Sequence, residues 1–147
     1  MIKKILIAVD GSDHSLKCVE MGASIAKAMG ATVLLFHVVK PYRLPDSLKK
    51  FAKAEHMATI DVDLLNQGAK YLLAGALDAA HEAGLKDVAI ETTEGPIART
   101  IIGRAKSFKA DIIVIGSRGM GDLEGMLRGG VSHRVETLAK CPVLVVK

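Results

Sequence analysis

The most constraining feature of this sequence is the alternation of short apolar runs with longer segments of helical periodicity. Ile5 to Val9 is a continuous apolar run, as are Ile112 to Ile115 and Val143 to Val146, and Thr32 to Val39 is a mainly apolar stretch. Runs this short are typical of strands that are buried on both faces of a parallel sheet. Val88 to Thr93 alternates apolar and polar residues, which predicts a further strand that is less buried than the others.

Helix signals lie between these runs. Ser12 or Asp13 can cap a helix that runs to Met29, and Gly30 supplies its stop. Further helices are expected over Ile97 to Phe108, over Ser132 to Lys140 and over about 61–84, the last as one long helix or as two with a break. The stretch 42–60 is the least legible. Strands joined by helices imply right-handed crossovers. The sequence therefore predicts an open, twisted, five-stranded parallel sheet with helices on both faces, a Rossmann-like α/β fold.

Size and composition suggest one cytoplasmic domain over residues 1–147. A chain of 147 residues, half of them hydrophobic, can bury a core without disulfides or metals. Cys18 and Cys141 are too few for a disulfide framework and lack metal-ligand spacing, which favours a reducing compartment. The N-terminal apolar run ends after five residues at Asp10, so it is not a signal peptide. No uncharged apolar stretch approaches the about 18 residues of a membrane span, so no membrane partner is expected.

The charge balance argues against nucleic acid as a partner. The net charge is +4, no run of like charges occurs, and aromatic residues make up only 3% of the chain. Proteins that bind nucleic acids usually combine a basic patch with aromatic residues for stacking on bases. Simple solubility and an anionic small ligand both account for the small basic excess.

A glycine-rich segment follows the fourth of these strands in the predicted sheet. Glycine is needed where φ is positive or where the backbone must approach a ligand closely. Successive backbone N–H groups, together with the N-terminus of the helix expected near Ser132, would form a cradle for an anion. A glycine-rich surface loop without a ligand is the plain alternative. The absence of Gly-Lys-Ser/Thr excludes a Walker loop, and Asp10-Gly11-Ser12 is not a Rossmann dinucleotide turn.

The spacing of these glycines resembles the ATP-binding signature of the universal stress protein family. Two residues separate Gly116 from Gly119, and nine separate Gly119 from Gly129. A short expected helix and the segment Cys141 to Val146 follow. Ile5 to Ser12 and Phe36 to Val39 are similar to segments of that family too. The resemblance implies the strand order 3-2-1-4-5. That order would place the ends of the first and fourth strands side by side, at the switch point where α/β sheets bind ligands.

The resemblance also implies the residues of an adenine-nucleotide site. The Asp10 carboxylate would contact the nucleoside, Val38 would meet the adenine, and the glycines would offer backbone to the triphosphate. The Ser132 hydroxyl would face phosphate. Plainer roles stay open: Asp10 as a turn cap, Ser132 as an ordinary N-cap, and the apolar residues as core. The complete set is Ala8, Val9, Asp10, Val38, Ile115, Gly116, Gly119, Gly129, Gly130, Val131 and Ser132.

One position departs from the family pattern. The family places Ser or Thr directly after the third glycine, whereas this chain has Gly130. The missing hydroxyl is worth roughly 0.5–1.5 kcal/mol as a typical net hydrogen bond, so weakened binding is expected. No catalytic or metal-binding residue is predicted, because no general base, arginine finger or pair of acidic metal ligands accompanies Asp10. Mg²⁺ can still accompany ATP because it screens the phosphates.

By resemblance, the leading function is an ATP-binding regulatory protein of the stress response without rapid turnover. Two other functions stay open, a dimeric interaction module with an empty loop and a slow ATPase or adenylate-handling enzyme. Val143 to Val146 would form an apolar strand at a sheet edge, which is a liability unless it is paired or covered. The resemblance implies that this strand pairs with its counterpart in a homodimer.

Overall fold

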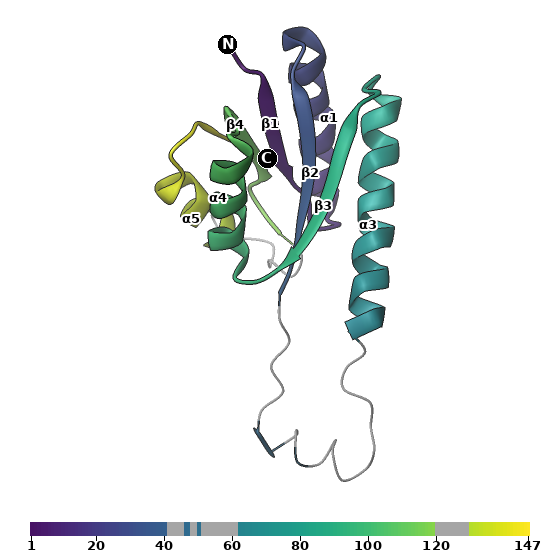
Figure 1. Cartoon of the computed structure of the whole chain (residues 1–147), viewed down its shortest axis with the longest axis vertical. Coiled ribbons are helices and arrows are strands. Elements are labelled where there is room, and N and C mark those ends of the chain that lie inside the picture. Colours follow the sequence, from purple (N-terminus) through teal and green to yellow (C-terminus); the bar gives the residue numbers. More distant parts are fainter. Residues whose placement is uncertain (41–45, 48–49, 51–61, 120–129) are drawn as a thin grey trace.

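The computed structural model describes residues 1–40, 46–47, 50, 62–119 and 130–147. Strands lie side by side at its centre and helices lie on both sides of them (Figure 1). The elements in chain order are β1 (Lys4–Ala8), α1 (Asp13–Met29), β2 (Thr32–Val39), α3 (Val62–Glu82), β3 (Val88–Glu94), α4 (Ile97–Phe108), β4 (Ile112–Gly116), α5 (Gly130–Leu138) and β5 (Val143–Val146).

The sheet is parallel throughout and has the strand order β3-β2-β1-β4-β5. This arrangement confirms the predicted fold class and strand order. β1 lies between two partners, because Ile5 pairs with Val33 of β2 on one side and with Ile112 of β4 on the other. The order of strands reverses between β1 and β4. The carboxyl ends of these two strands therefore border a switch point.

Several predicted boundaries are confirmed. Ser12 is the N-cap of α1 and its side chain accepts a hydrogen bond from the backbone N–H of Ser15. Gly30 ends α1 in the left-handed conformation, with φ of 66°, which a residue without Cβ adopts at little cost. β1 begins and ends one residue earlier than predicted. Most of the stretch 42–60 lies outside the described residues.

The start of α5 differs from the prediction. The helix was expected to begin at Ser132, but it begins at Gly130. Ser132 is therefore inside the first turn, and its predicted alternative role as the N-cap is wrong. Two adjacent residues of low or ordinary helix propensity, Gly130 and Val131, concealed this start in the sequence.

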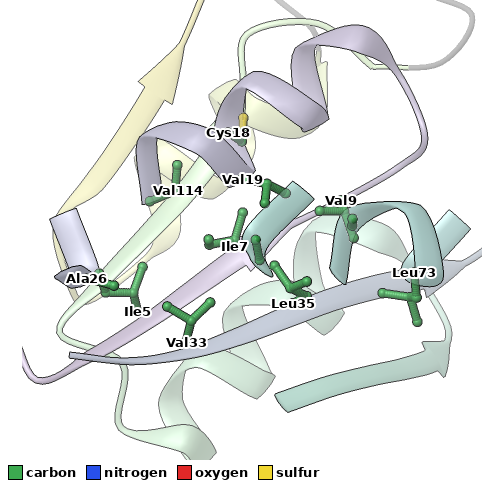
Figure 2. Packing of buried hydrophobic residues seen from close by; sticks show 12 residues of the cluster. Ile5, Ile7, Val9, Cys18, Val19, Ala26, Val33, Leu35, Leu73 and Val114 are labelled. Carbon is green, nitrogen blue, oxygen red and sulfur yellow. The ribbon is translucent and has the colours of Figure 1, made fainter. Parts of the chain in front are cut away.

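Both faces of the sheet are covered, as the apolar runs predicted. Figure 2 shows the face toward α1 and α3, where Ile7 and Leu35 of the strands lie in one layer with Val19 of α1 and Leu73 of α3. The opposite face packs against α4 and α5. β3 is the exception, because Ile90 keeps 48% of its surface exposed, in agreement with its alternating pattern.

No helix of the described ranges has the length and apolar character needed to cross a membrane.

Candidate functional site

A cavity of about 270 Å³ opens at the carboxyl ends of β1 and β4, at the switch point of the sheet. Residues from β1, β2 and β4, from the starts of α4 and α5, and from the first turn of α1 line it. Every predicted site residue that the structure describes is among them. Gly129 lies outside the described residues. The fold thus brings together segments that are more than 100 residues apart in the sequence.

The inner wall of the cavity is apolar. Ala8 of β1, Val38 of β2 and Ile115 of β4 belong to the predicted set, and all three are buried. The wall is completed by Phe36, Ile97 and Ile101, which the sequence analysis did not select. Ile97 and Ile101 stand one helical turn apart on α4, so both point to the same side of that helix. Their spacing marks them equally well as ordinary core residues, which is why no sequence signal singled them out.

Asp10 lies just beyond β1, and the sequence left a turn cap and a nucleoside contact as its alternative roles. Its Oδ1 accepts hydrogen bonds from the backbone N–H of Ser12 at 2.9 Å and from the Ser12 hydroxyl at 2.5 Å. Asp10 therefore holds the turn between β1 and α1. It also lines the cavity. Its place in the turn fixes the position of a negative charge at the cavity wall.

Cys18 lies near this charge but is a packing residue. Its side chain is fully buried, and burial raises the pKa of the thiol to about 12, with a further contribution from the negative charge of Asp10. A thiol with so high a pKa stays protonated at neutral pH and is a poor nucleophile. Cys18 therefore contributes to the core and not to chemistry at the cavity.

Gly116 lies in a crowded position at the end of β4, which favours a residue without Cβ. A Cβ at this position would lie 3.1 Å from the Arg118 carbonyl oxygen and 3.2 Å from the Cβ of His14. Gly116 is not among the described glycines with positive φ. Of the two reasons that the sequence offered for a glycine here, close approach is therefore the one that applies, and the close neighbours belong to the protein itself.

The N-terminus of α5 forms the opposite side of the cavity. Gly130, Val131 and Ser132 all line it. The N–H groups in the first turn of a helix have no partner within that helix, and they carry partial positive charge. The Ser132 side chain is only 4% exposed, and its hydroxyl donates to the Ser117 carbonyl at 3.4 Å. This bond ties the start of α5 to the residue that follows β4.

Further polar residues lie at or near the cavity. Arg118 is exposed and lines the cavity, although the predicted site left it out. His37 has its Nδ1 bonded to the Val9 carbonyl at 2.8 Å, so this ring nitrogen is satisfied within the fold. His133 is exposed, and it is not among the described residues that line the cavity. No group of three or more potential metal ligands occurs in the described part of the chain.

These features define a Rossmann-like α/β protein with a ligand-sized cavity at its switch point. The whole chain, residues 1–147, matches the profile of the Universal stress protein family, and the protein belongs to this family. It is 38% identical over 150 residues to Universal stress protein MJ0531 of Methanocaldococcus jannaschii, a match that covers all of this chain and 83% of that protein. It is 33% identical over 150 residues to Universal stress protein YxiE of Bacillus subtilis, and both chains are covered completely.

The fold also matches solved structures. A universal stress protein crystallised in complex with cAMP is 25% identical in sequence and superposes with a TM-score of 0.74. The match covers 99% of this chain and 96% of that chain.

Proposed function

We propose that the cavity binds an adenine nucleotide, ATP in particular, and that the protein is a cytoplasmic regulator of the stress response without rapid turnover. One observation carries the proposal. A single cavity at the switch point joins an apolar wall, a fixed carboxylate and the N-terminus of a helix. An adenine nucleotide has three matching parts, a flat apolar base, a ribose with hydroxyl donors and a chain of phosphates.

The positions of these features give the ligand a direction. The adenine fits the apolar wall between Val38 of β2 and Ile97 of α4. A ribose hydroxyl can donate to the Asp10 carboxylate, which would repel phosphate. The phosphates then lie toward Gly116, Gly119 and the start of α5, where backbone N–H groups and the helix dipole favour an anion. Arg118 adds positive charge on the same side.

The comparison with solved structures supports this proposal. The relative crystallised with cAMP shows that a protein with this fold and this family membership binds an adenine nucleotide. The present chain keeps the same overall fold over 99% of its length. We extend the ligand class, an adenine nucleotide, to this chain on the strength of the cavity described above.

Slow or absent hydrolysis follows from the groups around the cavity. Asp10 is the one carboxylate among the described lining residues, and its Oδ1 already accepts two hydrogen bonds. A second acidic residue to hold Mg²⁺ or to activate water is not present among them. Mg²⁺ would therefore be carried by the phosphates of ATP.

The decisive experiment measures what the protein binds. Protein purified without added nucleotide is denatured, and the released ligand is identified by mass spectrometry. Calorimetry with ATP, with GTP as the comparison, is expected to show micromolar-range affinity for ATP. Ile97→Glu, which puts a charge into the apolar wall, should abolish binding. Ile90→Glu is the matched control, because Ile90 is 48% exposed on β3 and does not line the cavity.

Two results would overturn the proposal. No heat and no thermal protection at millimolar ATP would show that the cavity and the glycine-rich segment bind no ATP, and would favour an interaction module. Phosphate release well above trace levels would show that the protein is an ATPase.

We also propose that the whole chain is one domain and that two copies form a homodimer through β5. β5 lies at the edge of the sheet, and each of its four residues is half-buried in the single chain. An apolar edge strand exposes apolar side chains together with unpaired backbone N–H and C=O groups. A second copy that pairs with this strand would bury the side chains and satisfy the backbone groups.

A further inference from the structure

His14 carries an unsatisfied hydrogen-bonding group directly behind the cavity wall. It stands in the first turn of α1, next to Ser15, which lines the cavity. Its Nδ1 is buried and has no hydrogen-bond partner among the described residues. A buried polar atom without a partner is uncommon, because it loses its bonds to water and gains none in return. Packing alone does not explain a histidine at this position.

The neighbours of His14 indicate what its partner is. The Cβ of His14 and the carbonyl oxygen of Arg118 lie 3.2 Å and 3.1 Å from the same point, the place that a Cβ on Gly116 would occupy. His14 and the Arg118–Gly119 peptide therefore face the same side of Gly116. The Sγ of Cys18 lies 3.7 Å from the same point. None of the described residues is bonded to Nδ1 of His14.

We infer that His14 is a positioning residue for the loop that follows β4. When a nucleotide occupies the cavity, the Nδ1–H of His14 donates to the Arg118 carbonyl and fixes the Arg118–Gly119 peptide unit. This inference rests on the proposed nucleotide binding, and it adds a residue on α1 that the glycine signature does not contain.

The geometry of the peptide bond turns this contact into an effect on the ligand. In a planar trans peptide the carbonyl and the following N–H point in opposite directions. A carbonyl of Arg118 held toward His14 therefore directs the N–H of Gly119 away from α1. Gly119 lines the cavity, on the side where the phosphates are expected. His14 would thus set the direction of one phosphate-binding N–H without touching the ligand.

Three substitutions distinguish this role from simple packing. His14→Asn keeps an N–H donor close to the position of Nδ1, His14→Gln moves the donor to the position of Nε2, and His14→Leu removes it. Calorimetry with ATP should show about tenfold weaker binding for Leu and Gln, a loss typical of one hydrogen bond. Asn should stay within about threefold of the wild type. His81→Leu is the control, since His81 is an exposed histidine in the last turn of α3.

A spectroscopic measurement on the wild type provides a second readout that needs no folded variant. The ¹⁵N resonance of His14 Nδ1 should change on addition of ATP to that of a hydrogen-bonded N–H, while the ring of His81 stays unchanged.

The outcomes separate the inference from the proposed function. If the wild type does not bind ATP, both fail together. If the wild type binds ATP but His14→Leu binds equally well, or Asn binds as weakly as Leu, only the role of His14 is overturned. The same holds if the Nδ1 resonance of His14 does not respond to ATP. Should His14→Leu fail to fold, the comparison of Asn with Gln and the wild-type spectrum decide.

Discussion

At the scale of single residues, positions around the cavity serve the fold and the proposed site together. Asp10 holds the β1–α1 turn through Ser12 and also supplies a charge to the cavity. Gly116 allows α1 and the Arg118 carbonyl to approach, and its backbone lines the same cavity. The sequence left a turn cap and a nucleoside contact as alternatives for Asp10, because a carboxylate suits both. The three-dimensional arrangement shows the turn bonds and brings the same residue to the cavity, and contact with a nucleoside is part of the proposed function.

Gly130 is the residue at which affinity is expected to be improved. A Cβ at Gly130 would meet no atom of the described residues within 4 Å, and the residue lines the cavity at the start of α5. Gly130→Ser should therefore fit and restore the hydroxyl of the family pattern, with a gain of roughly 0.5–1.5 kcal/mol, up to about tenfold in ATP affinity. Calorimetry measures the change.

The control for this substitution is Gly130→Ala, which adds the Cβ and the better helix propensity but no hydroxyl. If Ala and Ser improve ATP affinity equally, the hydroxyl has no part in binding. An unchanged affinity in Gly130→Ser would show that phosphate does not reach this position.

At the scale of elements, the sequence predicted the strands well because their apolar runs are interrupted by clear stop signals. Ser12 and Gly30 mark the ends of α1 by chemistry that depends only on local backbone geometry. The predicted start of α5 was two residues too late, because the glycine-rich sequence before Ser132 carries no comparable local signal for the start of a helix. Ile97 and Ile101 were missed for another reason: burial in a core and exposure to a cavity produce the same helical periodicity.

The packing of α1 on the sheet provides a prediction about stability. A Cβ on Gly22 would lie 2.4 Å from Cδ1 of Ile7, and Ile7 is fully buried. Gly22→Ala should therefore force α1 or Ile7 to shift and reduce the free energy of unfolding by about 1–3 kcal/mol. Urea denaturation followed by circular dichroism measures this change.

The matched control is Gly75→Ala on α3, where a Cβ would meet nothing within 4 Å in the part of the chain that the structure describes. This substitution adds helix propensity without a clash and should raise the free energy of unfolding by up to about 1 kcal/mol. If both substitutions stabilise the protein, the contact between α1 and β1 is looser than the structure indicates.

At the scale of the whole molecule, the proposed nucleotide site and the proposed dimer edge are linked through one residue. The backbone N–H of Ser117, directly after β4, donates to the Val146 carbonyl of β5 at 2.7 Å. The carbonyl of the same residue accepts from Ser132 at the start of α5. The two edges of the sheet differ in character, since β3 ends in polar residues whereas β5 consists of Val and Leu alone. The apolar edge is the one expected to pair.

The backbone of β5 indicates how to test this pairing without unfolding the sheet. The carbonyls of Pro142 and Val146 accept from Ile113 of β4 and from Ser117 directly after it. The even-numbered residues of β5 therefore face β4, and the N–H of Val145 points outward. Val145→Pro should remove one outward donor, leave the bonds to β4 intact and convert a dimer to a monomer in sedimentation velocity. Val145→Thr, which keeps both the N–H and the shape, should stay dimeric. A dimer that survives Val145→Pro, with the thermal unfolding of the chain unchanged, would place the interface elsewhere on the surface.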